Sequence, residues 1–141
     1  KLPAGMDRNS YLAFKTFFRY EGEKQVGNCA ACHSPAEFAD SKAHVVTRGG
    51  KAVPTPSLRN LDLSSEELEK VIIAKIGASS LKQAGEADEI DEAYSAIRLD
   101  KKDVPGLVAY LDLLKDVPDE KFRDLILEAT VLDTTGDLED Q

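Results

Sequence analysis

The chain has 141 residues, the size of one ordinary domain, and its formal net charge is −8 at pH 7. This negative charge disfavours binding to nucleic acid and to anionic membranes, and it favours a basic or neutral protein partner. The chain holds two cysteines and no apolar run near the roughly 18 to 20 residues that cross a bilayer, which excludes a disulfide-dense scaffold and a membrane span.

The first half of the chain predicts one helix and one long loop. Lys1 cannot be a translation start, so we expect a processed form or a piece of a longer protein. Aromatic and aliphatic residues at helical spacing predict a short helix over residues 10–19, which Gly22 and Gly27 separate from the cysteines. Residues 34–60 are rich in Pro, Gly, Ser and Thr and predict a long ordered loop of the kind that often wraps a ligand.

The second half of the chain predicts further helices. Ser64 and Glu67 form a capping-box pattern, and apolar residues then recur at helical spacing until Gly77. An aspartate cap and an early proline predict another helix, which ends before Pro118. No segment shows the two-residue alternation of a strand, so we predict an all-α fold with long loops. The predicted helices cover residues 64–77, 86–96 and 119–132, together with one that begins after an Asp100 or Asp103 cap and ends before Pro118, and an acidic tail follows over residues 133–141.

Residues 29–33 read Cys-Ala-Ala-Cys-His, the five-residue pattern that attaches a c-type haem. The thiols of Cys29 and Cys32 have the spacing to add across the two vinyl groups of one porphyrin edge, and His33 then falls beneath the iron as its proximal ligand. Both cysteines are used in this interpretation. It predicts one covalent haem c and a protein that matures in an exported, oxidising compartment such as the periplasm.

Three other interpretations of the two cysteines stay open. A zinc site made from these cysteines with His33 and His44 has poor spacing, because such sites place both histidines well away from the cysteine pair. A thioredoxin-like redox pair needs a preceding strand and a βαβ context, which the aromatic helix before Cys29 does not provide. A structural disulfide accounts for the cysteines but leaves His33 unexplained.

From residue 10 to residue 115 the chain resembles the class I cytochrome c fold. The order is a helix, the Cys-x-x-Cys-His motif, a loop, two middle helices and a final helix whose residues 103–111 read Asp-Val-Pro-Gly-Leu-Val-Ala-Tyr-Leu. The resemblance implies that the first and last helices cross beside the haem. We therefore expect a cytochrome c-like haem domain over residues 1–115, followed by a C-terminal helical extension and acidic tail over residues 116–141.

The chain also resembles one haem domain of the bacterial di-haem cytochrome c peroxidases. Residues 32–36 (Cys-His-Ser-Pro-Ala) and, most specifically, residues 55–60 (Thr-Pro-Ser-Leu-Arg-Asn) carry this resemblance. Those enzymes have two haem motifs and this chain has one, so we do not expect their two-haem reaction from it alone. Arg59 lies in this run, and we predict that its guanidinium pairs with a haem propionate, with Arg48 as a second candidate in the same loop.

The sequence does not determine which residue, if any, binds the iron on the side opposite His33. Class I cytochromes usually place a methionine shortly before the last helix, where this chain has Tyr94. Met6 is the only methionine and lies before the first helix, and His44 is the only histidine besides His33. Tyr94, Met6 and His44 are therefore the distal candidates, each with a simpler role as a core, gap-filling or surface residue. An open sixth position is the fourth alternative.

We expect an electron carrier that works between redox partners and needs no catalytic residues. In one alternative, an open iron binds peroxide or a gas, and His44 or one of Glu86, Glu89 and Glu92 lies over it as an acid or base. In another, the chain is a haem module or subunit of a larger redox enzyme and docks through residues 116–141. The same residues could instead form a homodimer.

Overall fold

The computed structural model describes residues 7–33, 37–59 and 61–116 of the chain. Its α-helices are α1 (Arg8–Phe18), α2 (Ser65–Gln83) and α3 (Val104–Asp116), and its 3₁₀ turns are η1 (Cys29–Ala31), η2 (Glu92–Ala96) and η3 (Lys101–Asp103). An antiparallel hairpin joins β1 (Ala43–His44) to β2 (Val53–Pro54). The predicted all-α class is confirmed, apart from this small hairpin. None of the described helices is both long and apolar enough to cross a membrane.

Most of the predicted C-terminal extension, with its helix over residues 119–132 and its tail over residues 133–141, lies outside the described residues.

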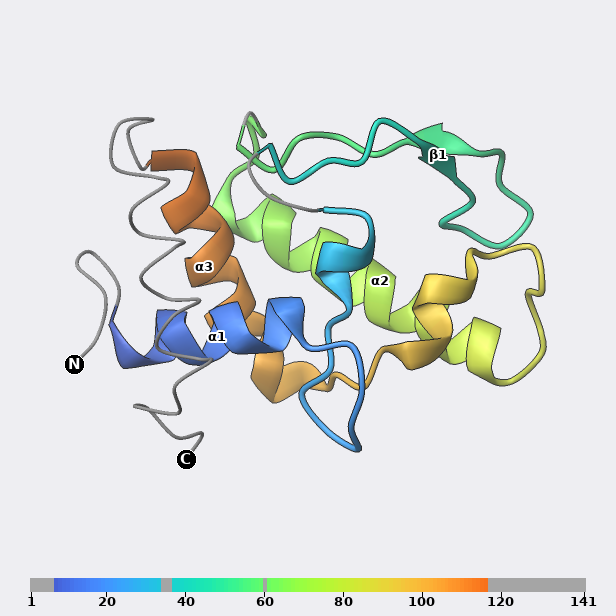
Figure 1. The fold of residues 1–141 in the computed structure, drawn as a ribbon, viewed down its shortest axis with the longest axis horizontal. Coiled ribbons are helices and arrows are strands. Elements are labelled where there is room, and N and C mark those ends of the chain that lie inside the picture. Colours follow the sequence, from blue (N-terminus) through green and yellow to red (C-terminus); the bar gives the residue numbers. More distant parts are fainter. Residues whose placement is uncertain (1–6, 34–36, 60, 117–141) are drawn as a thin grey trace.

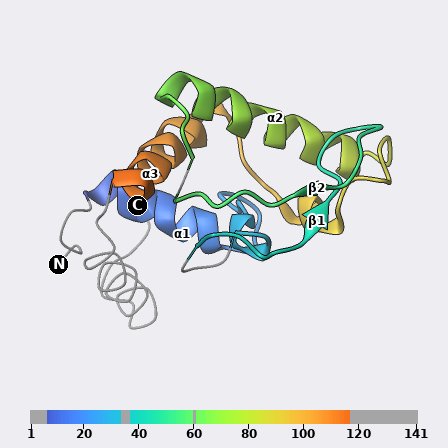
Figure 2. The same ribbon diagram turned by 90° about the horizontal axis from the view of Figure 1, so that it is seen from above.

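α1 and α3 cross (Figure 1). Aromatic rings fill the contact between them. The ring centroid of Tyr110 lies 5.4 Å from that of Phe17 and 6.1 Å from that of Phe14. α2 packs against α3, and α2 also contacts η2. The hairpin lies at the end of the molecule away from α1 and α3 (Figure 2). The crossing of α1 and α3 is the one that the resemblance to class I cytochromes implies.

Side-chain caps explain where two of these helices begin. The Asp7 carboxylate accepts a hydrogen bond from the backbone N–H of Ser10 at 2.8 Å, so α1 starts slightly before the predicted residue 10. Ser64 and Glu67 form the predicted capping box, in which each side chain accepts from the backbone N–H of the other residue. Both helix starts follow from signals in the sequence.

The predicted end of α2 at Gly77 is wrong. α2 continues to Gln83, and its chain turns at Gly85, whose φ of +75° suits glycine. Gly77 is exposed, whereas the residues that follow it, Ala78 and Ser79, are buried. Burial of this continuing face outweighs the roughly 1 kcal/mol that a glycine costs inside a helix.

Two further predictions need correction. The loop predicted over residues 34–60 contains the β1–β2 hairpin, in which His44 pairs with Val53. Strands of two residues are too short for an alternating pattern to reveal them. Residues 86–96, predicted to form an acidic helix, form a 3₁₀ turn only at their end, where the Asp91 side chain caps η2 by accepting from the N–H of Ala93.

Gly27 fixes the short segment between α1 and η1. Its N–H donates to the carbonyl of Thr16 at 2.9 Å. A Cβ at Gly27 would lie 2.8 Å from that oxygen and 3.0 Å from the sulfur of Cys29. The preceding residue, Val26, pairs with Arg98 in an isolated antiparallel bridge. The segment that delivers Cys29 is therefore held against α1 on one side and against the chain after η2 on the other.

Replacement of Gly27 by alanine should lower the free energy of unfolding by about 1 to 3 kcal/mol, the usual cost of overpacking, because the added methyl meets a backbone oxygen. Urea unfolding followed by far-UV circular dichroism measures this change. Gly77→Ala is the matched control: it fills open space in a helix and should gain up to about 1 kcal/mol. Equal stability of the wild type and Gly27→Ala would contradict the close packing of this segment.

Candidate functional site

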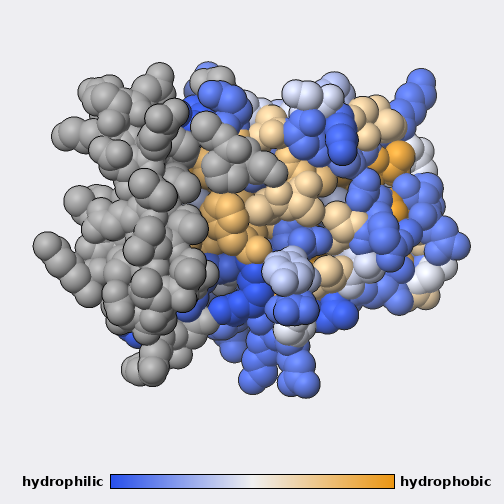
Figure 3. All heavy atoms as spheres, in the orientation of Figure 1, coloured by the Kyte–Doolittle hydropathy of each residue, from blue (hydrophilic) through white to orange (hydrophobic). Residues whose placement is uncertain are grey.

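An open, mainly apolar cavity lies between α2, the hairpin and the segment around η1. It holds about 1000 Å³ of space free of protein atoms, part of it open to solvent. Figure 3 shows apolar residues gathered in the middle of one face, with hydrophilic residues around them. A pocket of this kind suits a large hydrophobic guest. The apolar and aromatic residues that line it include Phe17, Leu58, Val71, Ile72, Tyr94, Ile97, Leu107 and Leu111.

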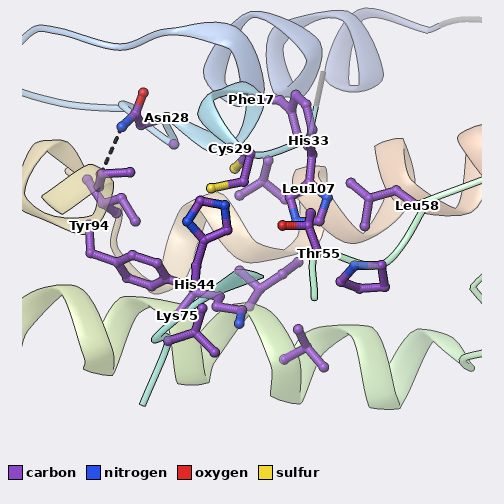
Figure 4. Close-up of a pocket in the computed structure, with 18 of the residues that line it drawn as sticks. Phe17, Asn28, Cys29, His33, His44, Thr55, Leu58, Lys75, Tyr94 and Leu107 are labelled. Carbon is purple, nitrogen blue, oxygen red and sulfur yellow. Dashed lines mark hydrogen bonds between the residues drawn. The ribbon is translucent and has the colours of Figure 1, made fainter. Parts of the chain in front are cut away.

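The turn η1 brings Cys29, Cys32 and His33 to one wall of the cavity. Asn28 precedes the turn in the left-handed conformation, with φ of +49°, which asparagine tolerates better than most residues. Its side-chain amide donates to the carbonyl of Ala93 at 2.8 Å (Figure 4). The predicted attachment motif is thus tied to η2, far away in the sequence.

Both thiols are free, and burial keeps them protonated. Cys29 borders the cavity, but protein encloses it on its other sides, and this burial raises its pKa to about 12. Burial also raises the pKa of Cys32, and the carboxylates of Asp40 and Asp91 add to the rise. A redox-active thiol pair has a lowered pKa instead. The electrostatics of this wall therefore disfavour a thioredoxin-like site.

His33 is held as a neutral imidazole. Its Nδ1 lies 2.7 Å from the carbonyl oxygen of Phe38. Because a carbonyl only accepts hydrogen bonds, Nδ1 carries the hydrogen and Nε2 keeps its lone pair. Burial lowers the pKa of His33, and the carbonyls of Phe38 and Pro56 oppose this shift. The second nitrogen of such a ring is the usual ligand to a metal.

Phe38 is placed for this contact by its own packing. Its side chain is fully buried, and its ring centroid lies 5.6 Å from that of Phe17. Its φ of +56° is uncommon for a bulky residue and is kept only when the surroundings demand it. The packed ring thus holds the backbone turn whose carbonyl orients His33.

His44 also lines the cavity, but both of its ring nitrogens are engaged. Nδ1 lies 2.7 Å from a carboxylate oxygen of Asp91, and Nε2 lies 2.7 Å from one of Asp40. Asp91 first and Asp40 second raise the pKa of His44. Burial alone would raise the pKa of Asp40, but hydrogen bonds, that from His44 foremost, hold it at about 2. His44 can ligate iron only after one of these two hydrogen bonds is broken.

The other predicted haem contacts have different positions. Tyr94 lines the cavity and is only 8% exposed. Met6 lies outside the described residues. Arg59 does not line the cavity, although its neighbour Leu58 does, so its pairing with a propionate stays a prediction. Arg48 is exposed and does not line the cavity either.

The described residues do not assemble the predicted Cys2His2 zinc alternative. The metal-ligating atoms that do gather, within 4.8 Å of one another, belong to Cys32, Asp40 and His44. The ion pair between His44 and Asp40 accounts for their closeness. Cys29 and His33 are not part of this group, so the zinc interpretation loses two of its four ligands.

Lys75 is a cavity residue that was not predicted. It lies half-buried on α2, four residues after Val71 and three after Ile72, both of which line the cavity with it. Burial lowers the pKa of Lys75. A lysine at helical spacing from the apolar stripe of its own helix is the signal that could have identified it.

The residues of the cavity fit the haem that the motif predicts. Two free thiols and the imidazole of His33, whose Nδ1 is held by the Phe38 carbonyl, share one wall, and mainly apolar side chains form the remainder. This set of donors matches a flat hydrophobic ring that reacts with thiols at one edge and takes a nitrogen ligand at its centre.

Comparison with known proteins agrees with this fit. A family model described as Cytochrome c matches residues 20–115. No curated protein and no solved structure gives a significant match to the chain.

Replacement of His44 by glutamine should destabilise the protein more at about pH 6 than at about pH 9. The carboxylates raise the folded-state pKa of His44 above its ordinary value of 6.5. The charged pairing therefore contributes its full stability below the ordinary value and loses it as the pH rises through the raised pKa. Urea unfolding of wild type and variant at both pH values measures the difference.

Lys42→Gln is the control for this experiment. It removes a positive charge from an exposed residue next to the hairpin and leaves both carboxylate partners of His44 in place, so its effect on stability should be the same at both pH values. If the stability lost in His44→Gln is the same at both pH values, His44 is not held as a doubly paired cation.

Proposed function

The chain belongs to the cytochrome c family, and we propose that it attaches one haem through Cys29 and Cys32, uses His33 as the proximal ligand, and transfers single electrons between redox partners. The observation that carries this proposal is that Cys29, Cys32 and His33 line one mainly apolar cavity, where the Phe38 carbonyl holds the Nδ1 of His33. Covalently bound haem c supplies the reversible one-electron chemistry of this family through its iron.

Attachment needs only the two neutral thiols. Cys29 and Cys32 each add S–H across a vinyl double bond: a C–S bond forms, the thiol hydrogen moves to the neighbouring carbon, and no oxidant is consumed. The backbone N–H of Gly27 and the side-chain amide of Asn28 fix the two residues that precede Cys29. The whole chain has two cysteines, which is the number that one haem requires.

The open side of the cavity supports electron exchange with a partner. Val53 and Val71 line the cavity and are still 44% and 40% exposed. Part of the apolar wall therefore reaches the surface, where a partner can approach. The net charge of −8 favours a basic or neutral partner, whose docking weakens as salt screens the attraction.

Peroxide chemistry is less well supported, because the described cavity offers no distal carboxylic acid. Glu86 and Glu92 are exposed, and Glu89 accepts a hydrogen bond from the N–H of Gly49 at 2.6 Å. None of the three lines the cavity. His44 lines it, but both of its nitrogens are bound to carboxylates.

The peroxidase-like run over residues 55–60 supports a more specific relationship. Thr55, Pro56 and Leu58 from this run line the cavity. In the proposal, the chain is similar to one haem domain of the di-haem peroxidases but works with its own single haem. It matures in an exported compartment such as the periplasm, where thiol addition to haem takes place in c-type cytochromes.

Replacement of both Cys29 and Cys32 by serine should abolish covalent haem attachment, and either single replacement should leave one thioether bond. The proteins are made in cells that mature c-type cytochromes, extracted with acidic acetone, and weighed by mass spectrometry under denaturing conditions. Ala31→Ser, an exposed change inside the motif, is the control and should keep its haem.

The same preparations test the stoichiometry and the redox role. A redox titration of the wild type should follow a one-electron curve with a single midpoint, since one haem is attached. Wild-type protein without haem, or a double variant that keeps haem after denaturation, would show that the proposed function is wrong.

A further inference from the structure

Lys75 brings an amine into the cavity from α2. In Figure 4 its side chain rises from α2, on the far side of the cavity from the turn that carries Cys29 and His33. Its helical neighbours Val71 and Ile72 line the same wall. An amine in this position faces the wall that holds the proposed proximal ligand.

Among the described residues, the Lys75 amine has no partner in a hydrogen bond or an ion pair. Two other lysines whose side chains are largely buried do have such partners. Lys82 and Lys115 each donate to a backbone carbonyl, at 2.8 Å and 2.7 Å, and each also pairs with a carboxylate. Lys75 instead lies over the ring of Tyr94, with Nζ 5.9 Å from the centroid. A half-buried amine among apolar side chains is costly unless it binds something.

The competing donors in the cavity are less available. His44 has both nitrogens bound to carboxylates. Burial raises the pKa of Tyr94, so its phenol stays protonated and is a poor ligand. Burial lowers the pKa of Lys75, which favours the neutral amine with its lone pair. Among the described lining residues there is no methionine to compete.

We propose that Lys75 is the distal, sixth ligand to the iron of the haem that His33 holds. This inference rests on the proposed function. Nζ gives one proton to solvent and its lone pair forms a bond to iron, so no electron is gained or lost. The Tyr94 ring beneath the amine positions it and does not itself ligate. His33 and Lys75 together would then leave no open position for peroxide or a gas, which suits a pure electron carrier.

The test compares Lys75→Ala with two controls in the haem-loaded protein. Lys70→Ala removes a lysine from an exposed position of the same helix, and Tyr94→Phe removes the rival phenol while keeping the ring. Each protein is examined by electron paramagnetic resonance in the ferric state and by visible absorption in the ferrous state before and after carbon monoxide is added.

The expected result is a low-spin wild type whose ferrous spectrum does not change with carbon monoxide. Lys75→Ala should lose the low-spin signal and bind carbon monoxide promptly, while both controls behave as the wild type does. Lys75→Met should restore a low-spin spectrum with a higher midpoint potential, because a thioether replaces the amine.

Several outcomes overturn the inference and leave the proposed function standing. One is a haem-loaded wild type that binds carbon monoxide at once. Another is a low-spin Lys75→Ala variant that excludes carbon monoxide. A third is a Lys75→Ala variant whose midpoint shifts while its spectra stay unchanged, which would assign Lys75 to a haem propionate. A wild type without covalent haem would overturn the proposed function itself.

A measurement on the wild type covers the case in which Lys75→Ala does not fold. Proton NMR of the ferrous protein labelled with ¹³C and ¹⁵N in lysine should show one lysine whose side-chain protons are shifted far upfield, because they lie over the porphyrin ring. If every labelled lysine has ordinary side-chain shifts, no lysine ligates the iron.

Discussion

The apolar cavity is the feature on which the rest of the structure depends. Buried residues form two clusters, one around α1, α3 and the first half of α2, the other around the end of α2 and η2. The cavity takes walls from both, for example through Leu107 and Tyr94. Each 100 Å² of apolar wall that a guest covers is worth about 2.5 kcal/mol. A bound haem therefore joins two small cores into one, and its attachment is part of the stability of the fold.

The fold also fixes the positions of the proposed attachment residues around the haem. The Gly27 N–H ties their segment to α1, the Asn28 amide ties it to η2, and the Phe38 carbonyl orients His33. These contacts join the segment around the two cysteines to residues from several parts of the chain. In the proposed function, residues fixed in this way have little to rearrange when the charge of the iron changes, which suits electron transfer.

Local signals in the sequence predict the candidate attachment site and the starts of α1 and α2. A helix cap and a five-residue motif both act between residues that are neighbours in the chain. These local signals fail where contacts between residues distant in sequence determine the structure. Gly77 lies in the interior of α2 because Ala78 and Ser79 beyond it are buried by tertiary packing. The pairing of His44 with Asp91, 47 residues away, has no local signature. Lys75 stands on the apolar face of its own helix, but only the fold shows that this face lines a cavity.

His44 and Lys75 line the same cavity and have opposite electrostatic surroundings. Two carboxylates at 2.7 Å stabilise the cation of His44, so its lone pair is not available to a metal. Lys75 has no described carboxylate beside it, and burial among apolar side chains disfavours its cation, a cost that the face of the Tyr94 ring offsets only in part. Histidine is the commoner iron ligand, but His44 instead binds two carboxylates and so anchors the hairpin. The carboxylates of Asp40 and Asp91 therefore distinguish the two cavity bases: they stabilise the protonated imidazole of His44, and no described carboxylate does the same for the amine of Lys75.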